Sequence, residues 1–373
     1  MRWKREHVEL VNGRARSGRR AAAATLLLAC VVALAGASPQ QNRADRRVQD
    51  RLEDAQRKEG QALIRLADDA MAGRASSDFA IGWRNDFFKA QTGTFVPFTV
   101  TIDRSSLTAP TALMYVRAAR REAATARAHE ASARYPFDVI FPVTLSAPAG
   151  QPLRITRGFA VAPGDYDVYV ALRERPADPL DSDGRLKGAV LKQPLTVPDF
   201  WTGGLATSTV MLADRIDEVA APLSGDDVLE RPYVIGTSEI HPSATSSFRR
   251  NRELIVVFLI YNPAVSADKN FDIEVEYHLF RRGSAVGAND ASAAEPHPPA
   301  RAGERYVTRT PPQRFRPSVM ASDFNPATGP ILAGQGILLS SFQEGEYRLG
   351  ITVTDLASRQ SLTRDVTFSV AGL

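Results

Sequence analysis

Four histidines follow the N-terminal segment, and they are the side chains best suited to bind a metal or transfer protons. They are His129, His241, His278 and His297. None has a second histidine or a cysteine at the spacing of a zinc site, and no His-Glu-x-x-His motif is present. Apolar and polar residues alternate around His278, and this pattern predicts that its side chain faces solvent. The sequence therefore predicts no metal site.

An acidic segment at residues 181–184 (DSDG) resembles part of a calcium-binding loop. When Gly184 takes the sixth position, Pro179 and Val190 take the first and twelfth, where such a loop needs Asp and Glu. The match fails, and Asp-Gly between two strand-like runs predicts a hairpin turn instead. Calcium binding by the aspartates of this loop stays open as an alternative.

Signatures of catalysis and of nucleotide binding are missing from the sequence. There is no G-x-S-x-G, P-loop or G-x-G-x-x-G motif, and Cys30 is the only cysteine. A Ser-His-Asp triad is defined by geometry, so a hydrolase with an unrecognised site stays open. We predict no catalytic residue, no cofactor and no enzyme, and we assign no ligand-binding residue.

The densest aromatic cluster is residues 82–88 (GWRNDFF). Trp83 there is a candidate platform for stacking a sugar, but a core anchor is commoner just before a first strand. Trp201 follows Phe200 at a predicted module junction, where we expect it to pack. A carbohydrate- or surface-polymer-binding protein is therefore an alternative function.

The N-terminus reads as an export signal. Seven basic residues within residues 2–20 precede an uncharged run at 21–37 that ends Ala35-Gly36-Ala37. The A-x-A end favours cleavage between Ala37 and Ser38. Retention as a membrane anchor is the main alternative, because the basic segment is long for a cleaved signal, although the 17 uncharged residues are at the short limit for a span that needs about 20.

This leader accounts for the basic character of the chain. It contains seven of the 46 basic and two of the 42 acidic residues, which leaves 39 basic and 40 acidic residues. The remainder gives no reason to expect nucleic-acid binding. Its most basic segment, residues 249–252 (RRNR), predicts a solvated turn. Without the leader there is no cysteine, so no disulfide can hold the exported part together.

Apolar spacing predicts one helix followed by strands. Apolar residues recur at helical steps over residues 42–73, with Gly73 as a stop. A stalk, a weak coiled coil and a helix lying on the first module are all open. Beyond residue 77 the period becomes two, and residues 253–261 (ELIVVFLIY) are apolar on both faces. That run predicts a central or covered strand.

The chain also contains an internal repeat. Residues 161–172 align with 342–353, since both hold a Gly-acid-Tyr opening to an alternating strand. The repeat predicts two tandem β-sandwich modules at 77–200 and 201–373. Each carries an insertion after its second matched strand, at 118–134 and 282–303. These insertions are candidate binding loops, and tolerated insertions without a function are an equal alternative.

Residues 345–359 (GEYRLGITVTDLASR) resemble the closing hairpin of immunoglobulin-like modules in uncharacterised bacterial secreted proteins. The resemblance implies a fold and no activity. We therefore expect a mainly β, extracytoplasmic protein with a non-enzymatic binding, adhesion or structural role in the bacterial envelope. Its expected partner is a protein or an envelope polymer. Contact with the membrane is expected only through an uncleaved N-terminal segment.

N-terminal sequencing of the exported protein tests the leader. We expect the mature chain to start at Ser38, because signal peptidase cuts after the small residues of an A-x-A end. A chain that still starts at its leader would instead support the membrane anchor.

Overall fold

The computed structural model describes residues 39–121, 134–176, 186–268, 270–283, 298–320, 324–326 and 329–372. The chain divides into two compact units. The first takes in the described residues up to Arg84, then Phe98–Arg157 and Gly164–Val197. The second takes in Asn85–Pro97, Gly158–Pro163 and the chain from Pro198 onward. Each predicted module is one continuous stretch of sequence. The observed units differ from the modules because residues 85–97 and 158–163 belong to the second unit.

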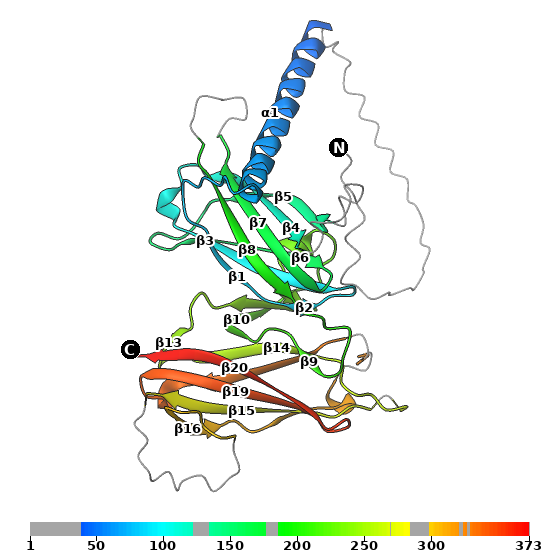
Figure 1. Cartoon of the computed structure of the whole chain (residues 1–373), viewed down its shortest axis with the longest axis vertical. Helices are drawn as coiled ribbons and strands as arrows, with labels where there is room; N and C mark the ends of the chain where they lie inside the picture. Colours follow the sequence, from blue (N-terminus) through cyan, green and yellow to red (C-terminus); the bar gives the residue numbers. More distant parts are fainter. Residues whose placement is uncertain are drawn as a thin grey trace, which may run out of the picture. The chain divides into compact units, whose positions relative to one another are not determined.

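The chain up to residue 197 forms two sheets and one long helix, which belong to the first unit apart from β2, the start of β3 and the ends of β1 and β6 (Figure 1). One sheet, the β4 sheet, has the antiparallel order β5-β4-β7-β8, and in the other β3 pairs with β1, β2 and β6. The elements up to residue 197 are α1 (Pro39–Met71), β1 (Gly82–Asn85), β2 (Phe88–Lys89), β3 (Thr94–Ile102), the 3-10 helix η1 (Arg104–Ser106), β4 (Thr111–Arg120), β5 (Phe137–Thr144), β6 (Leu153–Val161), β7 (Gly164–Glu174) and β8 (Gly188–Val197).

Helix α1 confirms the predicted helix and ends where the sequence indicates. Gly73 has φ +72°, its N–H donates to Ala70, and the N–H of Arg74 donates to Asp69. This pattern is a Schellman motif, which needs a residue that tolerates the left-handed conformation. The C-terminal half of α1 buries Leu63 and Ala67 against the outer face of the β4 sheet. Of the three alternatives, a helix lying on the first module describes this half.

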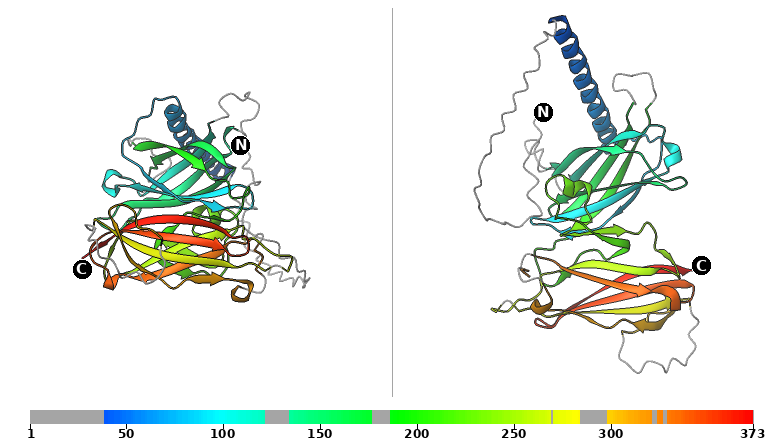
Figure 2. Two further views of the ribbon diagram at one scale, coloured as in Figure 1. Left: turned by 60° about the horizontal axis from the view of Figure 1, so that its bottom comes forward. Right: turned by 180° about the vertical axis from the view of Figure 1, so that it is seen from behind.

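Two layers form the second unit, and their strands pair antiparallel except for β13, which is parallel to β20 (Figure 2). The β14 sheet has the order β11-β12-β10-β14-β18, with β9 also on β14, and the β15 sheet has the order β13-β20-β19-β15-β16, with β17 also on β15. The elements are β9 (Ala206–Thr207), β10 (Met211–Glu218), α3 (Asp227–Glu230), β11 (Val234–Ile235), β12 (Ser238–Pro242), β13 (Ser247–Arg249), β14 (Glu253–Tyr261), β15 (Ile273–Arg282), β16 (Glu304–Arg309), β17 (Gln313–Phe315), the 3-10 helices η3 (Pro317–Val319) and η4 (Leu339–Ser341), β18 (Ile331–Leu338), β19 (Gly345–Asp355) and β20 (Gln360–Ala371).

Strand β14 is central and covered on both faces, as its composition predicts. Alternate side chains from Leu254 to Ile260 pack toward the β15 sheet. Those in between, such as Val257 and Leu259, pack in a second cluster with Phe88, Phe95 and other residues. The segment 85–97 thus supplies part of the outer cover of this sheet, which is why it belongs to the second unit.

The two units repeat one strand pairing. In the first, β4, β7 and β8 are neighbours and β3 pairs with β6; in the second, β15, β19 and β20 are neighbours and β14 pairs with β18. Strands C, F and G, and strands B and E, pair in this way in immunoglobulin-like sandwiches. The predicted fold of two tandem immunoglobulin-like β-sandwiches is confirmed.

The Gly-acid-Tyr motif opens the F strand of both units. Gly164 and Gly345 have φ +138° and +142°, where a Cβ would be strained. Tyr347, two residues after its glycine, is buried and donates from its hydroxyl to the Gln343 carbonyl, 2.7 Å away. This contact is the tyrosine corner of immunoglobulin-like domains. The repeat therefore reflects shared turn geometry.

A buried carboxylate closes the other end of each F strand. Glu174 accepts hydrogen bonds from the N–H groups of Thr108, Ala109 and Lys187. Asp355 accepts from the N–H groups before β15 and in the β19–β20 turn. These bonds lower the pKa of Glu174 against the effect of burial, which raises it.

His278 corrects one prediction, because it is buried and not on a solvent face. Its side chain is 2 % exposed, and its ring lies 6.2 Å from that of Tyr306. The neighbouring Phe280 is also buried, with the guanidinium of Arg348 4.0 Å from its ring centre. Side chains of the neighbouring strands cover this end of β15. Successive side chains of β15 still alternate between its two faces, but here the outer face is also buried.

The buried ion pair of Arg348 and Glu304 holds this region together. Arg348 Nη2 donates to Glu304 Oε2 at 2.6 Å, and Nη1 donates to Asp365 Oδ1 at 2.9 Å. The hydrogen bonds from Arg348 lower the pKa of Glu304 to about 2. Since β16 begins at Glu304, the pair fixes the strand that follows the second insertion to the sheet.

Several predictions fall on residues that the structure does not describe. These are the leader with Ala37 and Ser38, the DSDG turn, His129, His297 and most of both insertions. The first insertion begins later than predicted, because residues 118–120 are part of β4. We expected Trp201 to pack, but it is 47 % exposed. The neighbouring Phe200 is buried instead. No helix in the described ranges is long and apolar enough to cross a membrane.

Glu304→Gln tests the buried pair. We expect it to lower the free energy of unfolding by about 3 kcal/mol at pH 7, because it removes the buried carboxylate that Arg348 pairs with and leaves only Asp365 as a counter-ion. A carboxylate whose folded pKa is depressed stabilises above its unfolded pKa, and that contribution is lost as the pH falls through the folded pKa. The loss should therefore shrink between pH 4.5 and pH 2. Urea unfolding at several pH values measures it.

The exposed Glu346 on β19 supplies the control. Glu346→Gln should change stability by less than about 0.5 kcal/mol at any pH. A Glu304→Gln loss as small as that of the control would contradict the assigned role of the pair.

Candidate functional site

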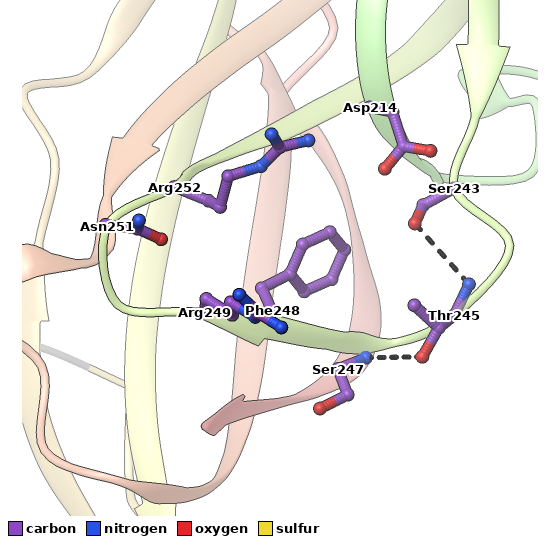
Figure 3. Close-up of a pocket in the computed structure, with 8 residues that line it drawn as sticks. All are labelled: Asp214, Ser243, Thr245, Ser247, Phe248, Arg249, Asn251 and Arg252. Carbon is purple, nitrogen blue, oxygen red and sulfur yellow. Dashed lines mark hydrogen bonds between the residues drawn. The ribbon is translucent and has the colours of Figure 1, made fainter. Parts of the chain in front are cut away.

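A polar hollow of about 350 Å³ opens in the second unit where the chain passes from one sheet to the other. It lies between the edge of β10, the β12–β13 connection and the β13–β14 turn (Figure 3). Its lining residues are Asp214, Ser243, Thr245, Ser247, Phe248, Arg249, Asn251 and Arg252. Seven of these side chains are polar or charged, so the hollow suits a polar ligand.

A β-bulge places Asp214 in the hollow. Strand β10 pairs with β12 through Ala213 opposite Pro242 and Arg215 opposite His241, which leaves Asp214 as the extra residue. A bulged residue is unpaired and its side chain is redirected out of the regular alternation. The carboxylate therefore lies on the same side as Ser243 in Figure 3.

Short polar residues shape the connection from β12 to β13. Ser243 is buried, and its N–H donates to the Leu212 carbonyl at 2.8 Å. The N–H of Ser247 donates to Thr245 Oγ1 at 3.0 Å, a local side-chain turn. These bonds let the chain leave the β14 sheet and begin β13, which runs parallel to β20 in the other sheet.

The two arginines come from the turn that joins β13 to β14. The N–H of Arg252 donates to the Arg249 carbonyl at 3.0 Å, and the Arg252 carbonyl accepts from the N–H of Leu339 at 3.3 Å. Arg250, between them, turns away and donates to the Ser340 carbonyl. Phe248 packs into the core below and fixes the start of the turn. The turn is solvated, as predicted for residues 249–252.

The guanidinium groups of Arg249 and Arg252 are available to a ligand. Within the described part of the chain, neither group forms a hydrogen bond or an ion pair with another side chain. The Arg252 side chain extends across the hollow toward the side of Asp214 in Figure 3. Each guanidinium offers five N–H donors in a fixed planar arrangement that matches carboxylate or phosphate oxygens. The hollow can therefore offer these donors to an acidic group.

The structure does not bring the histidines to this hollow. His241 lies outside it, with Nε2 2.9 Å from Asp217 Oδ2, and His278 is buried in the β15 sheet. In the described ranges, no three His, Cys, Asp or Glu side chains lie together as metal ligands would.

The aromatic residues are mostly engaged in the cores. Trp83 stacks on Phe98 at 4.6 Å between ring centres, with an interplanar angle of 14°. Seven of the nine tyrosines are buried: Tyr115, Tyr166, Tyr169, Tyr233, Tyr261, Tyr277 and Tyr347. These seven tyrosines therefore cannot line a sugar-binding surface.

Sequence reasoning identified the basic turn but not the hollow. The missing partners, Asp214 and Ser243, stand 35 and six residues before Arg249 in the printed sequence. A bulge leaves no period in the sequence, so no signal marked Asp214 as a lining residue.

Comparisons with known proteins give a limited result. No family model matches the chain, and neither does any curated protein. Among solved structures, alpha-2-macroglobulin of E. coli has 11 % identity and a TM-score of 0.20, covering 79 % of this chain and 15 % of that one. Red sea bream transglutaminase has 12 % identity and a TM-score of 0.20, covering 81 % and 33 %.

The fibronectin(III)-like modules of Clostridium thermocellum CbhA are 12 % identical with a TM-score of 0.17, covering 75 % of this chain and 87 % of theirs. The chain thus spans about one seventh of the macroglobulin it matches. Scores this low carry no argument about activity, and the fold assignment rests on the strand pairing and the tyrosine corner.

Proposed function

We propose that this chain is an exported, non-enzymatic binding protein of the bacterial envelope that holds an acidic group in the hollow of its second unit. The observation that carries the proposal is the pair of guanidinium groups, Arg249 and Arg252, facing a polar hollow without partners among the described side chains. The acidic group belongs to a protein or to an envelope polymer. Export rests on the leader, with its basic segment, apolar run and A-x-A end.

Hydroxyl groups beside the arginines support an oxyanion as the ligand. Thr245 and Ser247 are exposed at the rim, and hydroxyls donate to carboxylate, sulfate or phosphate oxygens as readily as they accept. Asp214 opposes this preference, because its carboxylate repels a second anion. The hollow therefore favours a ligand that places its anionic group at the arginines and a hydroxyl or amino group near Asp214.

The alternative of sugar binding by aromatic stacking receives less support. Trp83 already stacks on Phe98, and seven tyrosines are buried. A hydrolase with an unrecognised site remains a further alternative that no contact described above favours. A binding role fits loops and turns carried on a rigid sandwich.

Loss of the two arginines tests the proposal. The purified mature chain should bind immobilised poly-glutamate or polyphosphate at low salt, measured by biolayer interferometry, and should not bind neutral dextran. Arg249→Ala/Arg252→Ala should weaken binding by at least tenfold, since a hydrogen bond to a charged group contributes about 1.5–3 kcal/mol. Binding should also weaken as salt rises from about 0.05 to 0.5 M.

A double variant at exposed arginines elsewhere provides the matched control. Arg154→Ala/Arg305→Ala removes the same net charge from β6 and β16, outside the hollow. It should change the affinity by less than about twofold. Equal losses from the two double variants would mean that the chain binds anions by net charge alone, and the proposal would fail.

The variant Asp214→Asn should strengthen anion binding, in contrast to the loss of the arginines. Removing a carboxylate from the rim removes its repulsion of the probe, so affinity for polyphosphate should rise about two- to fivefold at low salt. The same titration measures it. An unchanged affinity would place the bound anion away from the β10 bulge.

A further inference from the structure

Strand β18 lies at the end of the β14 sheet with one side unpaired. Its eight residues pair with β14 from Leu338 opposite Glu253 to Ile331 opposite Ile260. No strand follows β18 in the order of the sheet in the part of the chain that the structure describes. A full-length strand therefore presents an open edge.

The backbone groups on that edge belong to the even-numbered residues of β18. The N–H of Leu339 donates to Arg252 on the β14 side, and the Gly334 carbonyl accepts from Gln313 on the other side. Because successive residues alternate in direction, the even residues face outward. The outward N–H groups, which have no partner in the described ranges, are those of Leu332, Gly334, Gly336 and Leu338.

The composition of β18 does nothing to block pairing. The strand reads ILAGQGIL, without a charge or a proline. Natural edge strands are usually short or carry charges, prolines or bulges, which prevent pairing with another chain. The other edge strands longer than two residues follow that rule here: β1, β5, β6, β8, β13, β16 and β17 all contain a charged residue.

The sequence of β18 is also complementary to itself. When two copies pair antiparallel about Gln335, Leu332 of each lies opposite Leu338 of the other, and Gly334 lies opposite Gly336. These pairs join the outward residues, which are the ones able to exchange backbone hydrogen bonds. Leu332 and Leu338 are 37 % and 69 % exposed, and Leu338 is the most exposed large hydrophobic side chain of the described chain.

We propose that the chain forms a two-fold symmetric dimer in which β18 pairs antiparallel with β18 of a second copy about Gln335. A two-fold contact brings the same surface of both copies together, and the near-palindrome of β18 meets this condition. On the outer face the position of Gly334 is open, whereas the Glu253 side chain lies over Gly336. The contact joins the two β14 sheets into one continuous sheet.

A single pair of strands makes a modest interface. Stable interfaces usually bury more than about 1,200 Å², so this dimer is expected to dissociate reversibly at micromolar concentration. Two outward carbonyls already accept from side-chain amides, that of Gly334 from Gln313 at 2.6 Å and that of Gly336 from Gln335 at 2.8 Å. On pairing, each oxygen is shared or released.

Charge exchange across the leucine pairs tests both the contact and its register. Sedimentation velocity of the mature chain between about 1 and 200 µM should show a monomer–dimer equilibrium. Leu332→Glu and Leu338→Lys should each raise the dissociation constant at least tenfold, since each places a lone charge opposite a leucine. The double variant L332E/L338K places Glu opposite Lys at both ends and should return the constant to within about threefold of the native value.

Ile216→Lys supplies a control of equal charge at an exposed position on β10. It should leave the dissociation constant unchanged, and circular dichroism should show all variants folded. The proposal is overturned if the native chain is monomeric at 200 µM. It is also overturned if Leu338→Lys leaves the dimer intact, or if the double variant dissociates as readily as the single ones.

Discussion

Burial of both faces of β14 is the constraint on which the second unit depends. The strand holds an almost unbroken apolar run, ELIVVFLIY, so a single covering sheet would leave half of its side chains in water. The β15 sheet covers one face. Phe88, Phe95 and Tyr233, which come from distant parts of the sequence, cover the other. The second unit therefore has two apolar clusters, one on each side of the same sheet.

The outer face of the β4 sheet and the matching face of the β15 sheet are covered in different ways. In the first, the outer face of the β4 sheet carries Tyr115 and Tyr169, and α1 covers them. In the second, the matching face carries Arg348, which pairs with Glu304 and lies over Phe280. An apolar face needs a cover, whereas a satisfied ion pair can close a face from within. The first face also carries the buried Arg117, whose guanidinium pairs with Asp68 of α1, so there the ion pair joins the sheet to its cover. The pair of Arg348 and Glu304, in contrast, lies within one sheet.

Most of the fold could be predicted from local pattern. The alternation around His278 located β15, the unbroken apolar run at residues 253–261 located β14, and the Gly-acid-Tyr motif located the F strands, because glycines with positive φ leave a fixed spacing before the tyrosine. His278 was misplaced because its burial depends on Tyr306 and other residues of neighbouring strands. The hollow escaped prediction for the same reason, since a bulge at Asp214 meets a turn that only the folded chain brings near.

The lack of charge on β18 is not a requirement of the fold. Strand β6, which pairs with β3 as β18 pairs with β14, carries Arg154 and Arg157 and still completes its sheet. Leu338 is 69 % exposed and Leu332 is 37 % exposed, so the core gains little from the first being apolar and only part of a side chain's burial from the second. A charged residue in place of Leu338 would protect the edge at almost no loss of packing. Two exposed leucines placed symmetrically about Gln335 are therefore better explained by a contact that forms outside the single chain.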